Sequence, residues 1–278
     1  MIRRPPRSTP SNSSAASDVY KRQGGGSSID VAKAIKLFYF KENFKQIPLI
    51  AIPTTAGSGS EATHFIVYYI GKEKQSKGDP NITLPDYVIL DPQFTLNLPK
   101  KITAYTGMDA LSQAIESYWS VNSNNESKKY AKKTINLVVN NLEKSIKNPS
   151  KKSRENMLKA ANFAGKAINI TKTTACHSIA YPITSYFKIP HGHAVALTLG
   201  EILVYNSKCK PEDCKDRRGA KYVKGVIKEI NKMLKSENSE DSCKKLKKMM
   251  GRIGLETRLS KLGIMEDGID IIIKRCLL

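Results

Sequence analysis

The sequence is poor in several features, and each shortage excludes a class of protein. Its five cysteines are an odd number without CxxC spacing, which excludes a disulfide framework and indicates the reduced thiols of a cytoplasmic protein. The longest apolar run, 194–205, is interrupted by Glu201, so no segment has the length and apolarity of a membrane span. Acidic residues are also scarce, at 25 against 46 basic ones, which gives a formal net charge of +21.

That positive charge, taken alone, predicts an acidic partner. The lysines are scattered over the polar faces of expected helices, as in KKYAKKTINLVVNNLEKSIKNPSKKS, which favours a solvated surface over a nucleic-acid site. A non-catalytic basic binding protein nevertheless remains an alternative function. A chain of 278 residues is long enough to form one large domain or two.

Residues 1–23, MIRRPPRSTPSNSSAASDVYKRQ, are rich in arginine, proline and serine and show no hydrophobic periodicity. They lack the apolar core of a secretory signal, although an Arg- and Ser-rich transit peptide would have a similar composition. We interpret them as a disordered leader, most simply translated adapter sequence joined to a gene fragment. We therefore expect the fold to begin at Gly24.

A glycine run leads into the first expected helix, residues 24–36. Gly24, Gly25 and Gly26 let the backbone approach a phosphate, and the positive helix end would face a pyrophosphate. Ser27 and Asp30 are candidates both for capping this helix and for contacting a nucleotide cofactor. A glycine-serine run is also common in linkers, so this motif alone leaves both interpretations open.

The apolar run PLIAIP, residues 48–53, predicts a buried parallel strand. The polar loop that follows it, TTAGSGSEAT, lies beyond the carboxyl end of the strand, where open α/β sheets bind their ligands. The hydroxyl groups of Thr54, Thr55 and Ser58 in this loop are candidate ligand contacts, with a simple Ser/Gly turn as the alternative. We expect further strands at 64–70 and 85–92.

After Leu98 the hydrophobic periods are helical. We therefore predict an α/β nucleotide-binding segment with an incomplete parallel sheet, residues 24–98, followed by an all-helical metal-binding domain, residues 99–278. The active site should lie between the two. The expected helices are 100–106, 109–119, 126–147, 151–166, 174–186, 192–207, 220–234, 243–253 and 257–262.

The helical part contains a candidate metal site made of Asp109, His177 and His191. Two imidazoles and one carboxylate suit a borderline divalent cation with open coordination positions, iron(II) or zinc more than calcium. Gln113 shares a helix face with Asp109, four residues on. Each residue also has an ordinary explanation, since histidines often lie on helix surfaces and Asp109 could cap a helix.

Five segments in order resemble the iron-containing (group III) alcohol dehydrogenases: GGGSSIDVAKA, IPTTAGSGSEAT, LPDYVILDP, GMDALSQAIES and PHGHAVAL. The resemblance runs from about Gly24 to about Met265. It implies hydride transfer between NAD or NADP and an aldehyde or primary alcohol, at a divalent cation that is iron(II) rather than zinc, in a homodimer. It implies that the glycine run and the hydroxyl groups of Thr54, Thr55 and Ser58 contact the cofactor. It also places Lys74 near the cofactor, with a solvated lysine as the alternative.

Asp109, His177 and His191 match the family's ligand positions, whereas Gln113 stands where many members have a fourth ligand, a histidine. An amide oxygen is a weak ligand, so a direct bond from Gln113 to the cation is doubtful. Tyr181 stands where many members carry another histidine. Tyr181 and His193 are candidate relays for the proton that the reduction consumes.

Within the family, DALSQAIESYWSVNS, GKAINITKTTA and HGHAVALTLGE are most similar to members that reduce a phosphonate-bearing aldehyde. Lys172, Thr173 and Thr174, just before an expected helix, are candidates for holding that anion, with ordinary helix capping as the alternative. A general short-chain alcohol dehydrogenase shares every motif. We also expect the strand before the glycine run and the helices after Met265 to be missing, which would leave an exposed sheet edge.

Overall fold

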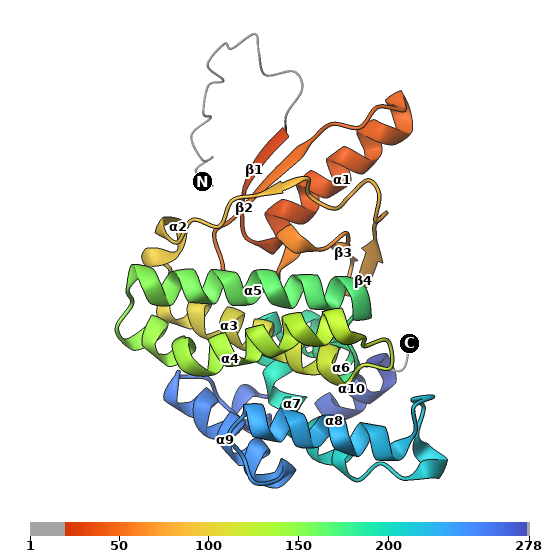
Figure 1. Cartoon of the computed structure of the whole chain (residues 1–278), viewed down its shortest axis with the longest axis vertical. Coiled ribbons are helices and arrows are strands. Elements are labelled where there is room, and N and C mark those ends of the chain that lie inside the picture. Colours follow the sequence, from red (N-terminus) through yellow and green to blue (C-terminus); the bar gives the residue numbers. More distant parts are fainter. Residues whose placement is uncertain (1–19, 277–278) are drawn as a thin grey trace.

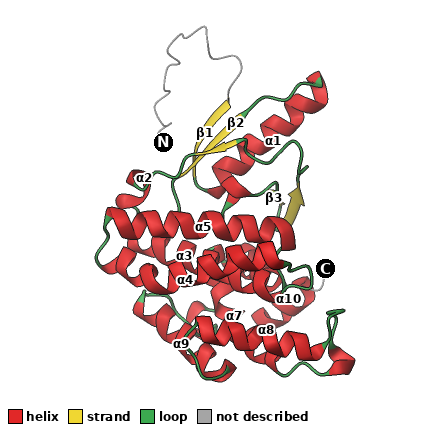
Figure 2. Cartoon of the chain, viewed as in Figure 1, coloured by secondary structure: helices red, strands yellow, loops and turns green. Residues whose placement is uncertain are grey.

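The computed structural model describes residues 20–276, and Figure 1 shows their arrangement. The strands and helix α1 form one end of the molecule, α8 and α9 the other, and α3, α4 and α5 lie between them. Figure 2 shows that strands are confined to the first end, so the predicted order of an α/β segment followed by a helical part is confirmed. None of the described helices combines the length and apolarity needed to cross a membrane.

The α/β part contains a small parallel sheet in the order β1-β2-β5, together with a separate antiparallel hairpin, β3-β4. Its helix α1 lies next to β1, β2 and β3. The elements are β1 (Tyr20–Gly24), α1 (Gly26–Asn43), β2 (Leu49–Pro53), the 3-10 turn η1 (Ser60–Ala62), β3 (Ile66–Ile70), β4 (Glu73–Lys77), β5 (Tyr87–Val88) and α2 (Gln93–Leu96).

Strand β1 corrects two expectations. A strand does precede the glycine run, and it pairs in parallel with β2 from Tyr20 opposite Leu49 to Gly24 opposite Pro53. Residues 20–23 therefore belong to the sheet and not to the leader. The rest of the predicted leader, residues 1–19, lies outside the described residues. The sequence YKRQG lacks an apolar pattern, so only its pairing with the buried β2 identifies it as a strand.

The other strand predictions are confirmed in part. Residues 64–70 contain β3, but it pairs with a strand that was not predicted, β4. The expected strand at 85–92 shrinks to Tyr87–Val88. Just before it, the Asp86 carboxylate accepts from Lys36 Nζ and from Leu49 N, each at 2.6 Å.

The helical part begins with α3 (Lys100–Trp119), α4 (Asn125–Lys147) and α5 (Lys151–Thr171). Two separate helices, 100–106 and 109–119, were predicted over the first of these, and this division is wrong. The helix instead continues through Gly107, where an added Cβ would overlap Leu142 of α4 and lie 3.1 Å from Met157 of α5. Gly107 therefore allows α4 and α5 to pack closely against α3, and the helix is continuous through it.

Helices α4 and α5 follow the prediction closely because their ends are encoded locally. Asn124 and Ser150 each accept a hydrogen bond from the backbone N–H three residues on, while Ser127 and Ser153 complete the two capping boxes. Their apolar faces pack on α3 to form a core that includes Met108, Leu111, Ile115, Ile135, Val138, Leu142, Met157 and Leu158.

The chain continues through α6 (Ala175–Phe187), α7 (His191–Ser207), the 3-10 turn η2 (Pro211–Asp213), α8 (Ala220–Met233), α9 (Ser239–Arg252), the 3-10 turn η3 (Ser260–Leu262) and α10 (Glu266–Cys276). The helix predicted at 257–262 is wrong beyond the short η3. The Glu256 carboxylate accepts from Thr257 N and Arg258 N, which favours a turn there. Helix α10 also shows that helical structure continues past Met265.

Candidate active site

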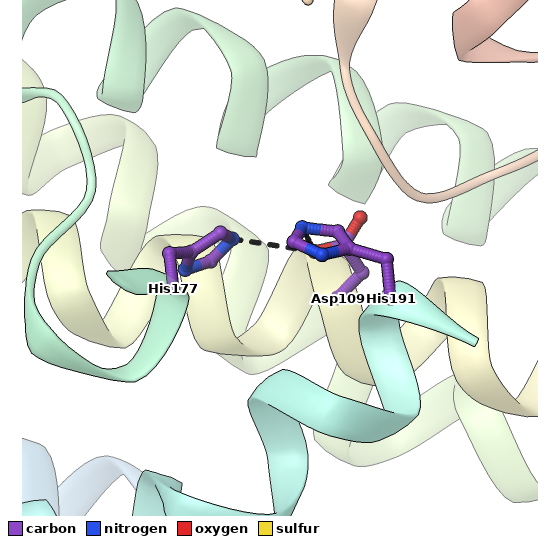
Figure 3. A group of neighbouring side chains, drawn as sticks. All are labelled: Asp109, His177 and His191. Carbon is purple, nitrogen blue, oxygen red and sulfur yellow. Dashed lines mark ion pairs between the residues drawn. The ribbon is translucent and has the colours of Figure 1, made fainter. Parts of the chain in front are cut away.

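The three predicted metal ligands come together from three helices (Figure 3). Asp109 lies in the middle of α3, His177 in the first turn of α6, and His191 at the start of α7. The Nε2 atoms of His177 and His191 lie 3.4 and 4.0 Å from Asp109 Oδ1, and one ligand atom from each residue falls within 4.8 Å of the others. The cluster can therefore surround a single small cation.

Unpaired polar atoms support that interpretation. Among the described residues, Asp109 Oδ1, Gln113 Oε1, His177 Nε2 and His191 Nδ1 are buried without a hydrogen-bond partner. Four such atoms in one place are unusual, because an unpaired buried donor or acceptor costs free energy. A bound divalent cation would give the oxygen and nitrogen lone pairs a partner, so the residues present fit the metal that the resemblance implies.

The charges of the cluster also suit a cation. Burial alone would raise the pKa of Asp109, but His177, His191 and the Gln113 amide together hold it below its usual value. Burial lowers the pKa of His191 to about 4, against the pull of Asp109. His191 is therefore neutral at physiological pH, as a ligand must be.

His177 behaves differently, because Glu116 pairs with its Nδ1. Burial would lower the pKa of this histidine, yet Glu116 and Asp109 raise it to about 9. Glu116 was not predicted from the sequence as a site residue. The one available signal was its spacing of seven residues from Asp109, which is two helical turns and hence the same face of α3.

Gln113 links the metal cluster to the nucleotide segment. Its side-chain Nε2 donates to the Ser58 carbonyl at 3.2 Å, which leaves the amide oxygen as the free group. Oxygen is the only atom of this side chain that can bind a cation. The orientation is therefore compatible with weak or water-mediated ligation, and direct ligation by Gln113 stays a prediction.

The predicted cofactor segments lie against each other at the carboxyl ends of β1 and β2. Thr54 N donates to the Gly24 carbonyl at 2.9 Å. A Cβ on Gly25 would lie 3.5 Å from Thr55 Oγ1, and one on Gly26 only 2.5 Å from Ser58 Oγ. Ser27 lies in the first turn of α1, which has no side-chain cap and so keeps backbone donors available for a phosphate.

Asp30 has a structural role that the sequence did not reveal. Its carboxylate accepts from Ser60 Oγ at 2.5 Å and from Val67 N at 3.1 Å, and it lies 3.3 Å from Lys33 Nζ. Lys33 is fully buried and also donates to Ser60 Oγ, Thr63 Oγ1 and the Phe65 carbonyl. This network holds the chain after β2 against α1, and a direct contact between Asp30 and the cofactor stays a prediction.

Lys74 and Tyr181 extend the metal cluster. The Tyr181 ring stacks on His191 with a centroid separation of 5.9 Å and an interplanar angle of 5°. Lys74 Nζ lies 3.6 Å from the Tyr181 ring centroid, so the structure places this lysine beside the metal cluster. Burial lowers the pKa of Lys74 to about 8 and raises that of Tyr181 to about 12.

His193 lies in a different environment from His191. It is buried, and its Nε2 lies 2.6 Å from the Glu256 carbonyl, which can only accept, so this ring nitrogen carries the proton and donates it. That bond fastens the segment after α9 to α7. The geometry therefore favours Tyr181 over His193 as the proton relay, a role that stays a prediction for both.

At the predicted anion site before α6, the donors of Thr174 are already paired. The backbone N–H and the hydroxyl of Thr174 both bind Glu116 Oε1, at 3.0 and 2.8 Å, and Trp119 Nε1 donates to the same hydroxyl. The start of the helix thus already holds a carboxylate. Thr173 is half-buried, and Lys172 is exposed, so neither gains the helix-end donors that the prediction assumed.

The structure thus joins a glycine turn at the start of a helix to a cluster of one carboxylate and two imidazoles that could hold a metal ion. The chain belongs to the iron-containing alcohol dehydrogenase family. The model of that family, "Iron-containing alcohol dehydrogenase", matches residues 23–92, and the "Fe-containing alcohol dehydrogenase family, C-terminal" model matches residues 103–277. The second match corrects the expectation that the resemblance ends near Met265.

Among its relatives, phosphonoacetaldehyde reductase from Streptomyces viridochromogenes is 34% identical over 65% of this chain and 46% of the relative. NADPH-dependent butanol dehydrogenase from Clostridium saccharobutylicum is 33% identical over 91% of this chain and 69% of the relative. The structure of sulfoacetaldehyde reductase from Bifidobacterium kashiwanohense in complex with NAD+ superposes with a TM-score of 0.80 and 30% identity, covering 93% of this chain and 69% of that one. The chain thus spans between about half and two thirds of the length of these relatives.

Proposed function

We propose that this chain carries the active site of a metal-dependent oxidoreductase that transfers a hydride between NAD or NADP and an aldehyde or primary alcohol. The observation that carries the proposal is the position of the cluster of Asp109, His177 and His191 next to the loop 54–58. The hydrogen bond from Gln113 to the Ser58 carbonyl joins the two. Such a junction places a reducible group within reach of both a cation and a cofactor.

The residues divide the work as follows. Asp109, His177 and His191 would hold the divalent cation, iron(II) rather than zinc, which when bound supplies Lewis-acid polarisation of a carbonyl group. The glycine turn and the loop 54–58 bind and orient the cofactor. Asp109 and His177 are only 6% and 3% exposed, so the cluster also restricts water. Tyr181 keeps its proton at neutral pH, because its pKa is raised to about 12, and can hold it near the reacting oxygen.

An activity assay of the full chain, loaded with iron(II) under anaerobic conditions, tests this proposal. We expect the chain to oxidise NADH or NADPH when given propanal or phosphonoacetaldehyde, and to lose this activity with a chelator. A chain that binds both cation and cofactor but reduces neither aldehyde would contradict the proposal. The alternative of a basic binding protein predicts polynucleotide binding that survives moderate salt, with no cofactor binding.

For the substrate, we propose a two-carbon aldehyde with an anionic head group, phosphonoacetaldehyde in particular. Two relatives are named for aldehydes of that kind, one with a phosphonate and one with a sulfonate. Lys74 supports the proposal, because its ammonium group lies beside Tyr181 and His191 at the cluster. A general short-chain alcohol dehydrogenase, as the butanol-dehydrogenase relative would suggest, predicts instead that propanal and butanal are the better substrates.

Replacing Lys74 with methionine should raise the KM for sulfoacetaldehyde about tenfold or more and leave the KM for propanal nearly unchanged, since a charge-assisted hydrogen bond contributes about 1.5–3 kcal/mol. The matched variant is Lys172→Met, which removes an exposed lysine. An equal loss on both aldehydes with Lys74→Met would assign Lys74 to the cofactor instead. A selective loss with Lys172→Met would restore the site predicted from the sequence.

The KM values for sulfoacetaldehyde and propanal should also differ in their pH dependence. The Lys74 ammonium is present below its pKa of about 8 and is lost above it. The KM for sulfoacetaldehyde should therefore rise between about pH 7 and 9, while the KM for propanal stays flat. A sulfonate keeps its charge throughout this range, so a parallel rise for both substrates would show that another group titrates.

A further inference from the structure

Glu116 is a fully buried carboxylate that connects two of the ligand-bearing helices, α3 and α6. Its Oε1 accepts from the backbone N–H groups of Thr174, Cys176 and His177 at 3.0, 3.0 and 3.3 Å, and from the Thr174 hydroxyl at 2.8 Å. Its Oε2 pairs with His177 Nδ1. One carboxylate thus caps the start of α6 and contacts a ligand ring in that helix.

The contact with His177 fixes where the ring carries its proton. An ionised carboxylate only accepts hydrogen bonds, so the hydrogen shared with Glu116 belongs to His177 Nδ1. The nitrogen left to bind a cation is then Nε2. This is the atom that lies 3.4 Å from Asp109 Oδ1 and lacks a hydrogen-bond partner among the described residues. Carboxylate partners of this kind orient metal-binding histidines.

We propose that Glu116 is a positioning residue that presents His177 Nε2 to the cation, with Nδ1 protonated, while anchoring the helix that carries it. The inference rests on the proposed metal site. Only a carboxylate fulfils both tasks, because both of its oxygens accept. A glutamine has one acceptor and one donor, so it must turn its amide group either toward the donors of α6 or toward the Nδ1–H.

The Glu116→Gln variant of the full chain tests the proposal with zinc as the probe, because zinc is diamagnetic. We expect its zinc affinity, measured by calorimetry, to fall about 10- to 100-fold. The control is Glu229→Gln. The Glu229 carboxylate also accepts a hydrogen bond from an α3 side chain, the Tyr118 hydroxyl, at 2.5 Å. This variant should bind zinc like the wild type. Unchanged zinc affinity in folded Glu116→Gln would overturn the proposal.

A second measurement does not depend on the variant folding. The chain has four histidines, so 15N-histidine spectra of the zinc-loaded wild type resolve each ring, with His177 assigned through its backbone resonances. We expect His177 to show a protonated, strongly hydrogen-bonded Nδ1 and a zinc-bound Nε2. Zinc bound to His177 Nδ1 would overturn the proposed role of Glu116 but not the metal site. A wild type that binds no zinc would overturn the metal site and this inference with it.

Discussion

Replacing Asp109 with asparagine should abolish tight binding of the divalent cation and lower kcat/KM on the order of 1,000-fold. Asp109 supplies the only carboxylate of the three-ligand cluster, and its Oδ1 faces the Nε2 atoms of both histidines. The amide keeps the size of the side chain but removes its charge, so the cation loses its one anionic ligand. A loss of about 4 kcal/mol of charge stabilisation corresponds to that factor in rate.

A matched control separates this effect from a general loss of stability. Asp216 is equally buried, at 7% exposed against 6%, and pairs with Arg218 in a salt bridge of 2.7 Å that involves none of the cluster residues. Asp216→Asn should therefore lower the unfolding temperature while leaving cation binding intact. Metal content after gel filtration, with calorimetric titration, measures both variants. An Asp109→Asn chain that retains a full equivalent of cation would remove Asp109 from the ligand set.

The sequence predicted those parts of the site that consist of short motifs. Asp109, His177 and His191 were identified by residue type and family resemblance, and the structure brings them together. The glycine turn and the loop after β2 were recognised in the same way, and they meet because both follow neighbouring parallel strands. The glycine turn and the loop were predictable because each is held by backbone geometry within a few residues, whereas the three ligands lie on three helices and were grouped through the family resemblance.

Features that depend on distant partners were missed. The helix start near Thr174 was predicted to bind an anion from a substrate, whereas Glu116, 58 residues earlier, already occupies it. Lys33 was not singled out from the sequence, yet it is buried among oxygens of residues 60–65. Strand β1 was missed for the same reason, since its pairing with β2 decides its structure. Sequence spacing alone does not reveal which partner satisfies a buried polar group.

Gly165 was likewise not singled out, although it decides how closely α5 approaches the loop that faces the cluster. A Cβ added to Gly59 would lie 2.6 Å from Gly165 Cα, and one added to Gly165 would overlap the Gly59 carbonyl and lie 3.0 Å from Ala62 Cβ. Two glycines thus let the loop backbone pack directly on the helix. Gly59 directly follows Ser58, whose carbonyl accepts a hydrogen bond from the Gln113 amide, so this contact positions the loop 54–58 against the helix that carries Asp109.

We expect Gly165→Ala to destabilise the chain by about 1–3 kcal/mol and to weaken cofactor binding, because the added methyl group must push the loop away from α5. Helix propensity alone predicts the opposite sign, a gain of roughly 0.5–1 kcal/mol. Gly225→Ala isolates that gain, since Gly225 also lies inside a helix, α8, but a Cβ there meets nothing within 4 Å. Urea unfolding of both variants gives the two changes in the free energy of unfolding. Cofactor titration gives the change in cofactor affinity that a displaced loop would cause. If both Gly165→Ala and Gly225→Ala stabilise the chain, the loop around Gly59 moves away from α5 at no cost in free energy. The close backbone contact would then not fix the position of Ser58.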